Sequence, residues 1–497
     1  MLFNSFEFVV FFSVFTLLYF STPRGGARRP VLLLIASYLF YAGWRPSFVL
    51  LLMLTTLVDY TSALVISQAR SQLTRKVALA AALTINLGIL GACKYLDFVL
   101  ASFVGTVGFF GVEMSPLAVN LILPVGVSFY TFQSVGYTLD VYNRRFSAER
   151  NLLYYAIYVA FFPQLVAGPI ERAQHMIAQY KAQRMTSPER IATGLWLVGW
   201  GLFKKMCVAD LAAPFVNGVY ADPSAFNGSY LFIASCLFAL QIYCDFSGYS
   251  DIAIGVARII GVDLMINFRQ PYFATSLTNF WRRWHISLST WFRDYLYIPL
   301  GGNRVARPAW VRNTLLVFGV SGLWHGANWT FIIWGLLHGA AMIVEDLVRR
   351  AKGPLRQPVA VGAEVVAPVT RTQPRPLAVG GAALGFAYTL TVVLVGWVFF
   401  RARSFSDAIY ILGSWTRPGP ISYGAFKVLG LPSVEILTLA ISVVILIVVD
   451  ALLSRGSKIF LSARRSWVLS IGGAVALFYF LILFGAVGSH DFIYFQF

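Results

Sequence analysis

The chain has 497 residues, of which 58% are hydrophobic and 12% are charged, and its mean hydropathy is +0.70. These values lie outside the range of water-soluble domains and predict an integral membrane protein. A formal charge of +18 could indicate nucleic acid binding, but the basic residues fall mainly between apolar stretches, where topology and anionic lipid headgroups account for them. We therefore expect membrane lipid, and no nucleic acid, as a partner.

Apolar stretches recur along the whole chain. A helix needs about 20 residues to cross roughly 30 Å of hydrocarbon. We expect an all-α polytopic membrane protein with about ten to thirteen transmembrane helices, some of them short, tilted or re-entrant. The apolar stretches are residues 6–21, 31–43, 48–68, 77–93, 152–167, 191–203, 228–243, 314–323, 329–345, 377–400, 433–452 and 467–488.

Charges at the ends of these stretches predict the orientation. Residues 1–7 contain no Lys or Arg, and no cleavage site of small residues precedes the basic run 24–29, so the first stretch is interpreted as a transmembrane helix and not as a signal peptide. Because Lys and Arg favour the cytoplasmic side, we expect the N-terminus outside and the basic run 70–76 inside. The final stretch follows Arg464 and Arg465, which predicts an external C-terminus.

Two polar segments interrupt the apolar pattern. Residues 267–313 contain seven arginines, one acidic residue and many aromatics, and we expect them to line the cytoplasmic face. Residues 349–376 combine basic residues with five prolines, which is typical of a flexible cytoplasmic loop. This loop separates core helices, residues 1–348, from C-terminal helices, residues 377–497. Within the second group, residues 401–432 are predicted to form an external interfacial turn or amphipathic helix.

Two of the five histidines lie in polar and aromatic surroundings beside apolar stretches, and they are the candidates for chemistry. The sequence LWHGANW, residues 323–329, places His325 and Trp324 at membrane depth, where polar groups are costly and usually functional. Imidazole suits general-base work because its unperturbed pKa is about 6.5, and Asn328 shares a face with His325 if the segment is helical. The alternative is a buried histidine that only hydrogen-bonds a helix carbonyl.

The second candidate, His285, lies in FWRRWHISLSTWFRDY, residues 280–295, where cations, aromatics and hydroxyls alternate. Arginines bind phosphate through bidentate donors and pack against planar rings, so coenzyme A or a phosphopantetheine arm is a candidate ligand. The alternative is anchoring at the membrane surface by positive charges and an aromatic belt. The candidate binding residues here are Arg282, Arg283, Trp284, Ser289 and Arg293.

The sequence YCDFSGYSD, residues 243–251, sets two carboxylates and several hydroxyls between apolar flanks. Acidic residues inside a membrane are functional candidates by default. Asp245 and Asp251 do not share a helical face, and a carboxylate that pairs with a nearby arginine to fix the architecture is an equal alternative. Asp245 and Ser247 are therefore predicted only as supporting residues.

The remaining histidines and the cysteines are interpreted as structural or exposed. On one unbroken helix His338 would point about 140° away from His325. His175 is predicted in a solvated or interfacial loop, and His490 near the outer end of the last helix. The four cysteines lack metal-ligand spacing, so we predict neither a disulfide nor a metal site.

Five segments and the closing FIYFQF together resemble the membrane-bound O-acyltransferase (MBOAT) family. The resemblance spans most of the chain and is strongest to the bacterial alginate O-acetylation branch, which is similar to the D-alanyl transferases of teichoic acid modification. The matching segments are PVGVSFY (124–130), FFPQLVAGPI (161–170), DFSGYSD (245–251), residues 280–302 and WHGANW (324–329).

The resemblance implies a ring of transmembrane helices around a thinned central region, with a cytoplasmic funnel and an extracellular pocket that meet near a catalytic histidine. By motif match this residue is His325, and the family's second histidine, which positions substrate or donor, corresponds to His285. The resemblance also implies the bacterial inner membrane and no bound cofactor. The implied donor is a thioester, either acetyl-CoA or an acyl carrier, and the implied partners are periplasmic acetyltransferase proteins and a polysaccharide as final acceptor.

In the expected reaction, His325 activates an acceptor hydroxyl while Asn328 stabilises the oxyanion. The immediate acceptor, a serine of a partner protein or the sugar itself, stays open. One alternative is a non-catalytic transporter of acyl donor or polysaccharide, although the sequence has no inverted repeat with paired broken helices. The other is an MBOAT enzyme that acylates a lipid or a protein.

Overall fold

The computed structural model describes residues 1–115, 118–351, 379–455, 467–486 and 492–493. All regular elements within these ranges are helices, which confirms the predicted all-α polytopic architecture. By length and composition, seven helical segments in the described ranges can cross a membrane, and shorter apolar helices accompany them. The seven are Pro46–Gln68, Gln72–Phe109, Pro188–Ala221, Gly228–Ile259, Trp329–Ala351, Gly381–Arg401 and Ser433–Ser454.

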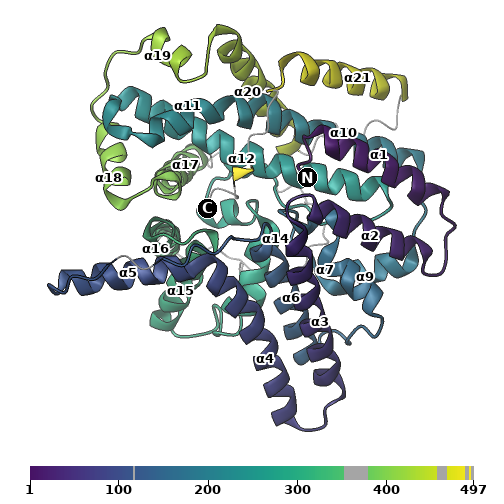
Figure 1. Cartoon of the computed structure of the whole chain (residues 1–497). Helices are drawn as coiled ribbons and strands as arrows, with labels where there is room; N and C mark the ends of the chain where they lie inside the picture. The colour runs from purple at the N-terminus through teal and green to yellow at the C-terminus, as the bar shows by residue number, and fades with distance from the viewer. Residues whose placement is uncertain (116–117, 352–378, 456–466, 487–491, 494–497) are drawn as a thin grey trace.

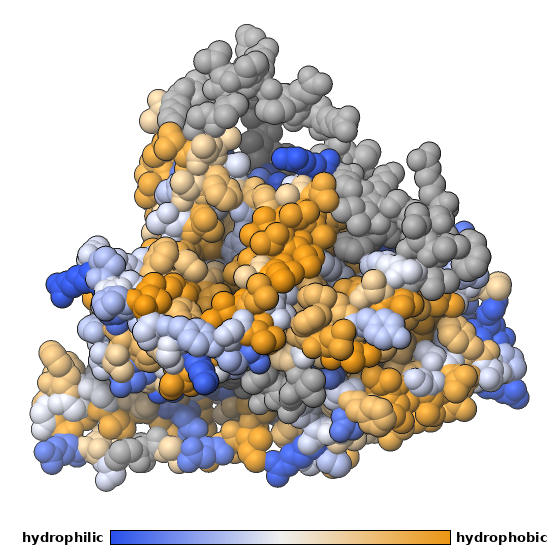
Figure 2. Space-filling view, turned by 90° about the horizontal axis from the view of Figure 1, so that it is seen from above, coloured by the Kyte–Doolittle hydropathy of each residue, from blue (hydrophilic) through white to orange (hydrophobic). Residues whose placement is uncertain are grey.

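Short helices lie in the middle of the molecule, with longer ones around them. Figure 1 shows α14 (Ile286–Phe292) near the centre, with α12 (Gly228–Ile259) above it and α6 (Val127–Tyr142) beside it. The outer surface is apolar over broad areas (Figure 2); Phe6 and Leu17 on α1, for example, are 79% and 71% exposed. Lipid tails supply the environment in which such side chains are stable.

The N-terminal helices include a closely packed pair, α3 and α4, joined by a buried polar contact. The Asn86 amide on α4 donates to the Asp59 carboxylate on α3 at 3.0 Å, and such contacts hold helices together in an apolar surrounding. The helices of this part are α1 (Phe6–Ser21), α2 (Arg28–Ala42), α3 (Pro46–Gln68), α4 (Gln72–Leu90), the π-helix η1 (Gly91–Tyr95) and α5 (Leu96–Phe109).

The apolar stretch 152–167 is not one continuous span. Pro163 has no N–H with which to continue the preceding helix, and α7 ends at Ala160. The break is buried, since Phe161 and Phe162 are 0% exposed, as expected for irregular backbone at membrane depth. The facing turn needs Gly126, where φ is 77° and a Cβ would lie 2.6 Å from the Leu165 carbonyl oxygen. The helices here are α6, α7 (Leu152–Ala160), α8 (Phe162–Leu165) and α9 (Ala173–Ala182).

Two long helical segments, Pro188–Ala221 and Gly228–Ile259, pack closely against each other through glycines. A Cβ on Gly201 would lie 2.5 Å from the Gly248 carbonyl oxygen, and one on Gly255 would lie 2.5 Å from that of Gly194, so only small residues permit this approach. The polar sequence 243–251 continues α12 without a break. These elements are α10 (Pro188–Phe203), the π-helix η2 (Lys204–Ala209), α11 (Asp210–Ala221), the 3₁₀ turn η3 (Pro223–Ala225) and α12.

The arginine-rich segment 267–313 combines exposed arginines, such as Arg282, with a buried middle. That it lines the cytoplasmic face stays a prediction. Trp284 and His285 within it are each 1% exposed, and Glu345 binds the start of α13 through the Leu277 N–H at 2.6 Å and the Thr278 hydroxyl at 2.9 Å. Long-range contacts therefore draw this segment inward. Its elements are η4 (Pro271–Phe273), α13 (Leu277–Trp281), α14, the π-helix η5 (Arg293–Tyr297) and the start of α15 (Arg307–His325).

The C-terminal helices follow residues 352–378, which lie outside the described ranges. These residues include most of the predicted loop 349–376. Arg349 and Arg350 belong to the end of α16. The segment 401–432, predicted as an interfacial turn or amphipathic helix, contains two short helices joined by a turn. The helices are α16 (Trp329–Ala351), α17 (Val379–Arg401), α18 (Phe405–Ser414), α19 (Tyr423–Val428), α20 (Ser433–Ser454) and α21 (Trp467–Phe484).

Candidate active site

His325 is the last residue of α15, and its ring lies among aromatic side chains. The residue is 3% exposed, and its ring centroid lies 5.0 Å from that of Trp334 and 5.3 Å from that of Phe400. The helix ends because Gly326 adopts an extended conformation. A Cβ on Gly326 would lie 2.1 Å from the Phe331 ring, so glycine at this position lets the chain turn sharply beneath the histidine.

His285 lies at the start of α14 in a left-handed conformation, with φ of 43°, and is 1% exposed. Its Nδ1 lies 3.2 Å from Oδ1 of Asn267. The same oxygen accepts from the backbone N–H and the hydroxyl of Ser287 at 3.2 and 3.0 Å. Asn267 therefore fixes both the turn and the ring. Nε2 of His285 is buried and has no hydrogen-bond partner within the described part of the chain.

Trp324 brings the two histidines together. Its ring centroid lies 5.0 Å from that of His325 and 6.0 Å from that of His285, and the His285 ring also contacts Phe246 of α12, with the centroids 4.6 Å apart. We call Phe246, His285, Trp324, His325 and Trp334 the aromatic centre. It joins two sequence segments that were predicted separately and shields both imidazoles from water.

Asn328 does not share a helical face with His325. The helix ends before it, and its side chain instead caps α16 by accepting from the Thr330 N–H at 3.0 Å while donating to the Arg403 carbonyl at 3.0 Å. The sequence placed the Asn328 amide beside the His325 imidazole only if residues 323–328 were helical. Because α15 ends at His325, this condition is not met.

The predicted arginines lie outside the aromatic centre. Arg282 is exposed, the Arg283 guanidinium donates to Asn279 at 2.9 Å, and Arg293 pairs with Asp294 at 2.7 Å. Ser289 donates to the Trp284 carbonyl at 3.3 Å. Of the candidates in this segment besides His285, only Trp284 is fully buried, and its ring packs against Trp397 with the centroids 4.9 Å apart.

Asp245 belongs to a lysine–carboxylate network made by Lys204, Lys205, Asp210, Asp245 and Asp251, and Ser247 binds one lysine of this network. Lys205 contacts Asp210 at 2.8 Å and Asp245 at 2.9 Å, while Lys204 contacts Asp251 at 2.6 Å and the Ser247 hydroxyl at 2.9 Å. The cations are lysines of η2, whereas the sequence had suggested an arginine.

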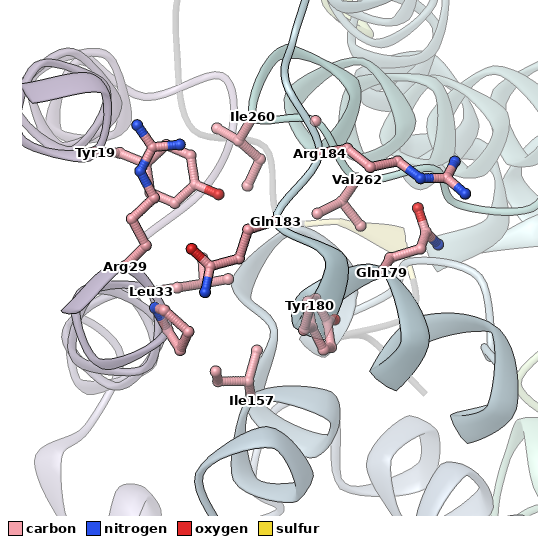
Figure 3. A pocket seen from close by; sticks show the side chains of 12 residues that line it. Tyr19, Arg29, Leu33, Ile157, Gln179, Tyr180, Gln183, Arg184, Ile260 and Val262 are labelled. Atoms are coloured by element: carbon pink, nitrogen blue, oxygen red, sulfur yellow. The ribbon is translucent and has the colours of Figure 1, made fainter. Parts of the chain in front are cut away.

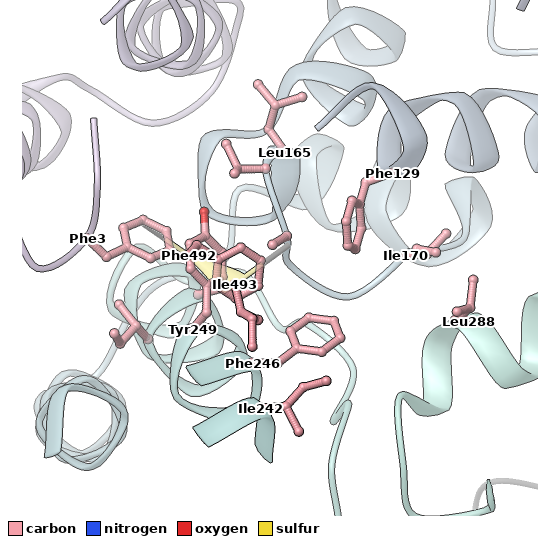
Figure 4. Close-up of a cluster of buried hydrophobic side chains, with 14 of the residues drawn as sticks. Phe3, Phe129, Leu165, Ile170, Ile242, Phe246, Tyr249, Leu288, Phe492 and Ile493 are labelled. Carbon is pink, nitrogen blue, oxygen red and sulfur yellow. The ribbon is translucent and has the colours of Figure 1, made fainter. Parts of the chain in front are cut away.

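The last described residues reach this network from the far end of the chain. The Ile493 N–H donates to Asp245 at 2.7 Å, and Phe492 and Ile493 are each 1% exposed. Figure 4 shows both next to Phe246 and Tyr249 of α12. The network and this segment therefore support the side of α12 that carries Phe246 of the aromatic centre.

Sequence reasoning missed Lys94 and Tyr95 of η1. The Lys94 ammonium donates to the carbonyls of Trp324 and His325 at 2.8 and 2.9 Å, and the Tyr95 hydroxyl donates to the Leu323 carbonyl at 3.0 Å. A signal was present, because Lys94 is an ionisable residue just beyond the apolar stretch 77–93, and such residues near membrane depth mark candidate sites.

Of the other histidines, His338 borders the aromatic centre through Trp334. His338 belongs to α16, not to the helix of His325, and is 0% exposed against Trp281 and Trp334. His175 lies on α9 and not in a loop; its side chain is 50% exposed and contacts Glu171 at 3.2 Å. His490 lies outside the described residues. The four cysteines are free thiols.

The cavity in Figure 3 is separate from the histidines. Tyr19, Arg29 and Tyr180 are among its lining residues, and its volume is about 20 Å³, which is room for a single water molecule. A second, open groove runs along the outer face of α15 and α16, with Leu315 and Leu336 in its wall. Neither is lined by His285 or His325, so neither is the reaction site suggested by the aromatic centre.

Comparison with known proteins gives the family. The description "MBOAT, membrane-bound O-acyltransferase family" matches residues 127–354. The chain is 39% identical over 428 residues to the probable alginate O-acetylase AlgI of Azotobacter vinelandii, an alignment that covers 84% of this chain and 79% of that protein. The corresponding protein of Pseudomonas aeruginosa is 38% identical over 424 residues, with 84% and 76% covered.

The similarity extends to an enzyme named for another polymer. The peptidoglycan O-acetyltransferase of Helicobacter pylori is 34% identical over 442 residues, covering 83% of this chain and 79% of that protein. The family match includes both histidines of the aromatic centre. With this identity over most of its length, the multi-pass chain is an acyltransferase and belongs to the membrane-bound O-acyltransferase family.

Proposed function

We propose that this acyltransferase moves an acetyl group from a cytoplasmic thioester across the bacterial inner membrane for O-acetylation of an envelope polysaccharide. The observation that carries the proposal is the meeting of His285 and His325 at Trp324 in an enclosed aromatic centre. Enclosure suits a thioester, because water at the reacting carbon would hydrolyse it.

In the proposed reaction, His325 is the general base. Its neutral imidazole takes the proton of an acceptor hydroxyl as the hydroxyl oxygen attacks the thioester carbonyl carbon. A C–O bond forms, the C–S bond breaks, and the imidazolium returns the proton to the departing thiolate. The products are an acetyl ester and a free thiol, and no electrons are exchanged with an external partner.

The developing oxyanion needs a donor near His325. Asn328 is occupied as a helix cap, so we assign this role to groups of the aromatic centre. The donor available there is the Trp324 indole N–H, which is buried and unpartnered within the described ranges. Nε2 of His285 is an acceptor in the neutral ring, because Nδ1 donates its hydrogen to Oδ1 of Asn267. A donor that is already oriented stabilises the transition state without first releasing water.

Donor binding is assigned to the polar end of the segment 267–313. The exposed Arg282, with Arg283 and Arg293, offers guanidinium groups for the phosphates of acetyl-CoA or of a carrier-bound phosphopantetheine. Trp284 is buried, and together with Ser289 it would border the pantetheine arm. In this proposal the phosphates bind outside the aromatic centre and the acetyl group binds within it.

The acceptor is proposed to be a glycan hydroxyl or a serine of a periplasmic partner protein that passes the acetyl group to the glycan. The relatives include proteins named for alginate and for peptidoglycan O-acetylation, and both names specify a polysaccharide. We therefore name alginate-like exopolysaccharide as the first acceptor to test and peptidoglycan as the second. The distribution of basic residues supports the proposal that both chain termini lie outside the cytoplasm.

The test uses inside-out membrane vesicles with radiolabelled acetyl-CoA outside and partner proteins plus polysaccharide in the lumen. Wild type is expected to move label to the lumenal polymer, and His325→Ala is expected to stop this. Equal transfer by both would remove His325 from catalysis and support a conduit for the donor. Labelled lipid without partner proteins would instead identify a lipid-modifying enzyme.

A further inference from the structure

Two consecutive residues of η1 donate hydrogen bonds to the backbone carbonyls at the C-terminal end of α15. The carbonyls of Leu323, Trp324 and His325 accept hydrogen bonds from Tyr95 and Lys94, with distances of 3.0, 2.8 and 2.9 Å. The last carbonyls of any helix lack partners in the helix itself. Here three of them, including that of the proposed general base, are bound by one short segment.

The chemistry of this contact is specific to a helix end. The C-terminal end of a helix carries partial negative charge, so a cation there is stabilised. The Lys94 ammonium also lies 6.0 Å from the centre of the Trp324 ring, where a cation is attracted to the aromatic face. η1 is a π-helix, a local widening that occurs frequently at functional sites.

Lys94 differs in this respect from Lys204 and Lys205. Those two lysines bind carboxylates and join helices to one another, which is an architectural use of charge. Lys94 instead binds the backbone of Trp324 and His325 themselves. A shift of this backbone would move the imidazole of His325 directly, since only two rotatable bonds separate the ring from it.

We propose that Lys94 is a positioning residue for His325, with Tyr95 as its weaker helper. The ammonium fixes the last turn of α15 and thereby the distance and angle between the imidazole and the acceptor hydroxyl. This inference rests on the proposed role of His325 as general base. Lys94 lies more than two hundred positions from His325 in the sequence. The inference gives it a direct effect on the chemical step.

The kinetic test compares Lys94→Met, Lys94→Arg and Tyr95→Phe in the vesicle assay. Lys94→Met keeps the length of the side chain but removes its donors, and we expect kcat to fall about 30-fold to 100-fold, as for a misplacement of about 1 Å, with KM for acetyl-CoA within about twofold. Lys94→Arg, which keeps a cationic donor, should recover kcat to within about tenfold of wild type. Tyr95→Phe should lower kcat about threefold.

A second readout does not depend on the reaction. Hydrogen–deuterium exchange of a peptide covering residues 320–328 is expected to be faster in Lys94→Met than in wild type, and to return toward the wild-type rate in Lys94→Arg, because the last turn of a helix frays when its carbonyls lose their partners. The matched control is Asp97→Asn. Asp97 lies on α5, three residues further along, and binds the N–H groups of Val119 and Asn120, so its replacement should leave both kcat and this peptide unchanged.

The outcomes separate this inference from the proposed function. Unchanged exchange and unchanged kcat in Lys94→Met would overturn the positioning role, and so would equal losses in Asp97→Asn. If Lys94→Met fails to fold, Tyr95→Phe decides, and an unchanged exchange rate in that variant would overturn the proposal. Full activity of His325→Ala would remove the proposed general base, whereas faster exchange in Lys94→Met would still show that Lys94 holds the end of α15.

Discussion

The aromatic centre and the lysine–carboxylate network both place ionisable groups inside the protein, but they treat them in opposite ways. In the network, Lys204 and Lys205 contact carboxylates at 2.6–2.9 Å. In the aromatic centre, His285 and His325 lie among rings, and the buried Nε2 of His285 has no partner in the described part of the chain.

The difference shows how to separate architecture from chemistry in a membrane interior. Charges that neutralise one another are satisfied before any substrate arrives, and they hold η2, α11 and α12 together. A neutral imidazole in an apolar surrounding can accept a proton from a substrate. The predictions below therefore separate loss of activity from loss of stability, in order of decreasing effect.

Replacement of His325 by glutamine is expected to lower kcat about 1,000-fold, because the general base is lost. The melting temperature in detergent should change little, since the glutamine side chain fills a similar volume. The comparison is made per folded molecule with His175→Gln, whose exposed position on α9 predicts normal activity. A His325→Gln enzyme with normal kcat would contradict the assignment.

Replacement of Lys205 by methionine should act on stability. It leaves Asp210 and Asp245 buried without their shared cation, and breaking such a pair costs about 3–5 kcal/mol. The free energy of unfolding in detergent is the measurement, and Lys427→Met on the exposed part of α19 is the control. Adding Asp245→Asn should restore part of the loss, and the folded fraction should keep kcat within about threefold.

Replacement of His285 by asparagine is expected to lower kcat about 10-fold to 100-fold, because the ring that packs against Trp324 is lost and the reacting groups are held less accurately. Asparagine tolerates the left-handed backbone conformation at this position better than most residues, so the turn should survive. Circular dichroism and melting temperature check the fold. A loss of stability without loss of kcat would assign His285 to the architecture instead.

Replacement of Asn328 by alanine should have the smallest effect. Loss of the cap on α16 costs about 1 kcal/mol, and kcat should remain within about twofold because the amide faces Arg403 and Thr330. Ser422→Ala, which removes a similar cap from α19, is the matched control. A large fall in kcat for Asn328→Ala alone would restore the oxyanion role expected from the sequence.

Much of the fold could be predicted because the membrane makes hydrophobic length a direct signal. The stretches 48–68, 329–345 and 433–452 fall within observed helices of suitable length. The break at residues 160–162 and the inward course of residues 267–313 could not be predicted, because they depend on contacts between distant segments, such as that of Glu345 with Leu277.

The residues of the site that belong to one short motif could be predicted from the sequence. Those that depend on contacts between distant segments could not. Residues 324–329 and the segment around His285 identified both histidines of the aromatic centre. The contact of Lys94 with α15 crosses 230 positions, and the turn at Gly326 depends on the Phe331 ring. Neither can be inferred from local sequence, and the turn is what moves Asn328 away from His325.

The most direct test of this account measures acetyl transfer per folded molecule for His325→Gln and Lys205→Met in the same inside-out vesicles. The account predicts that His325→Gln is folded and almost inactive, and that Lys205→Met yields little folded protein, each molecule of which transfers acetyl groups at close to the wild-type rate. Normal transfer by folded His325→Gln, or inactive folded Lys205→Met, would contradict the separation of chemistry from architecture.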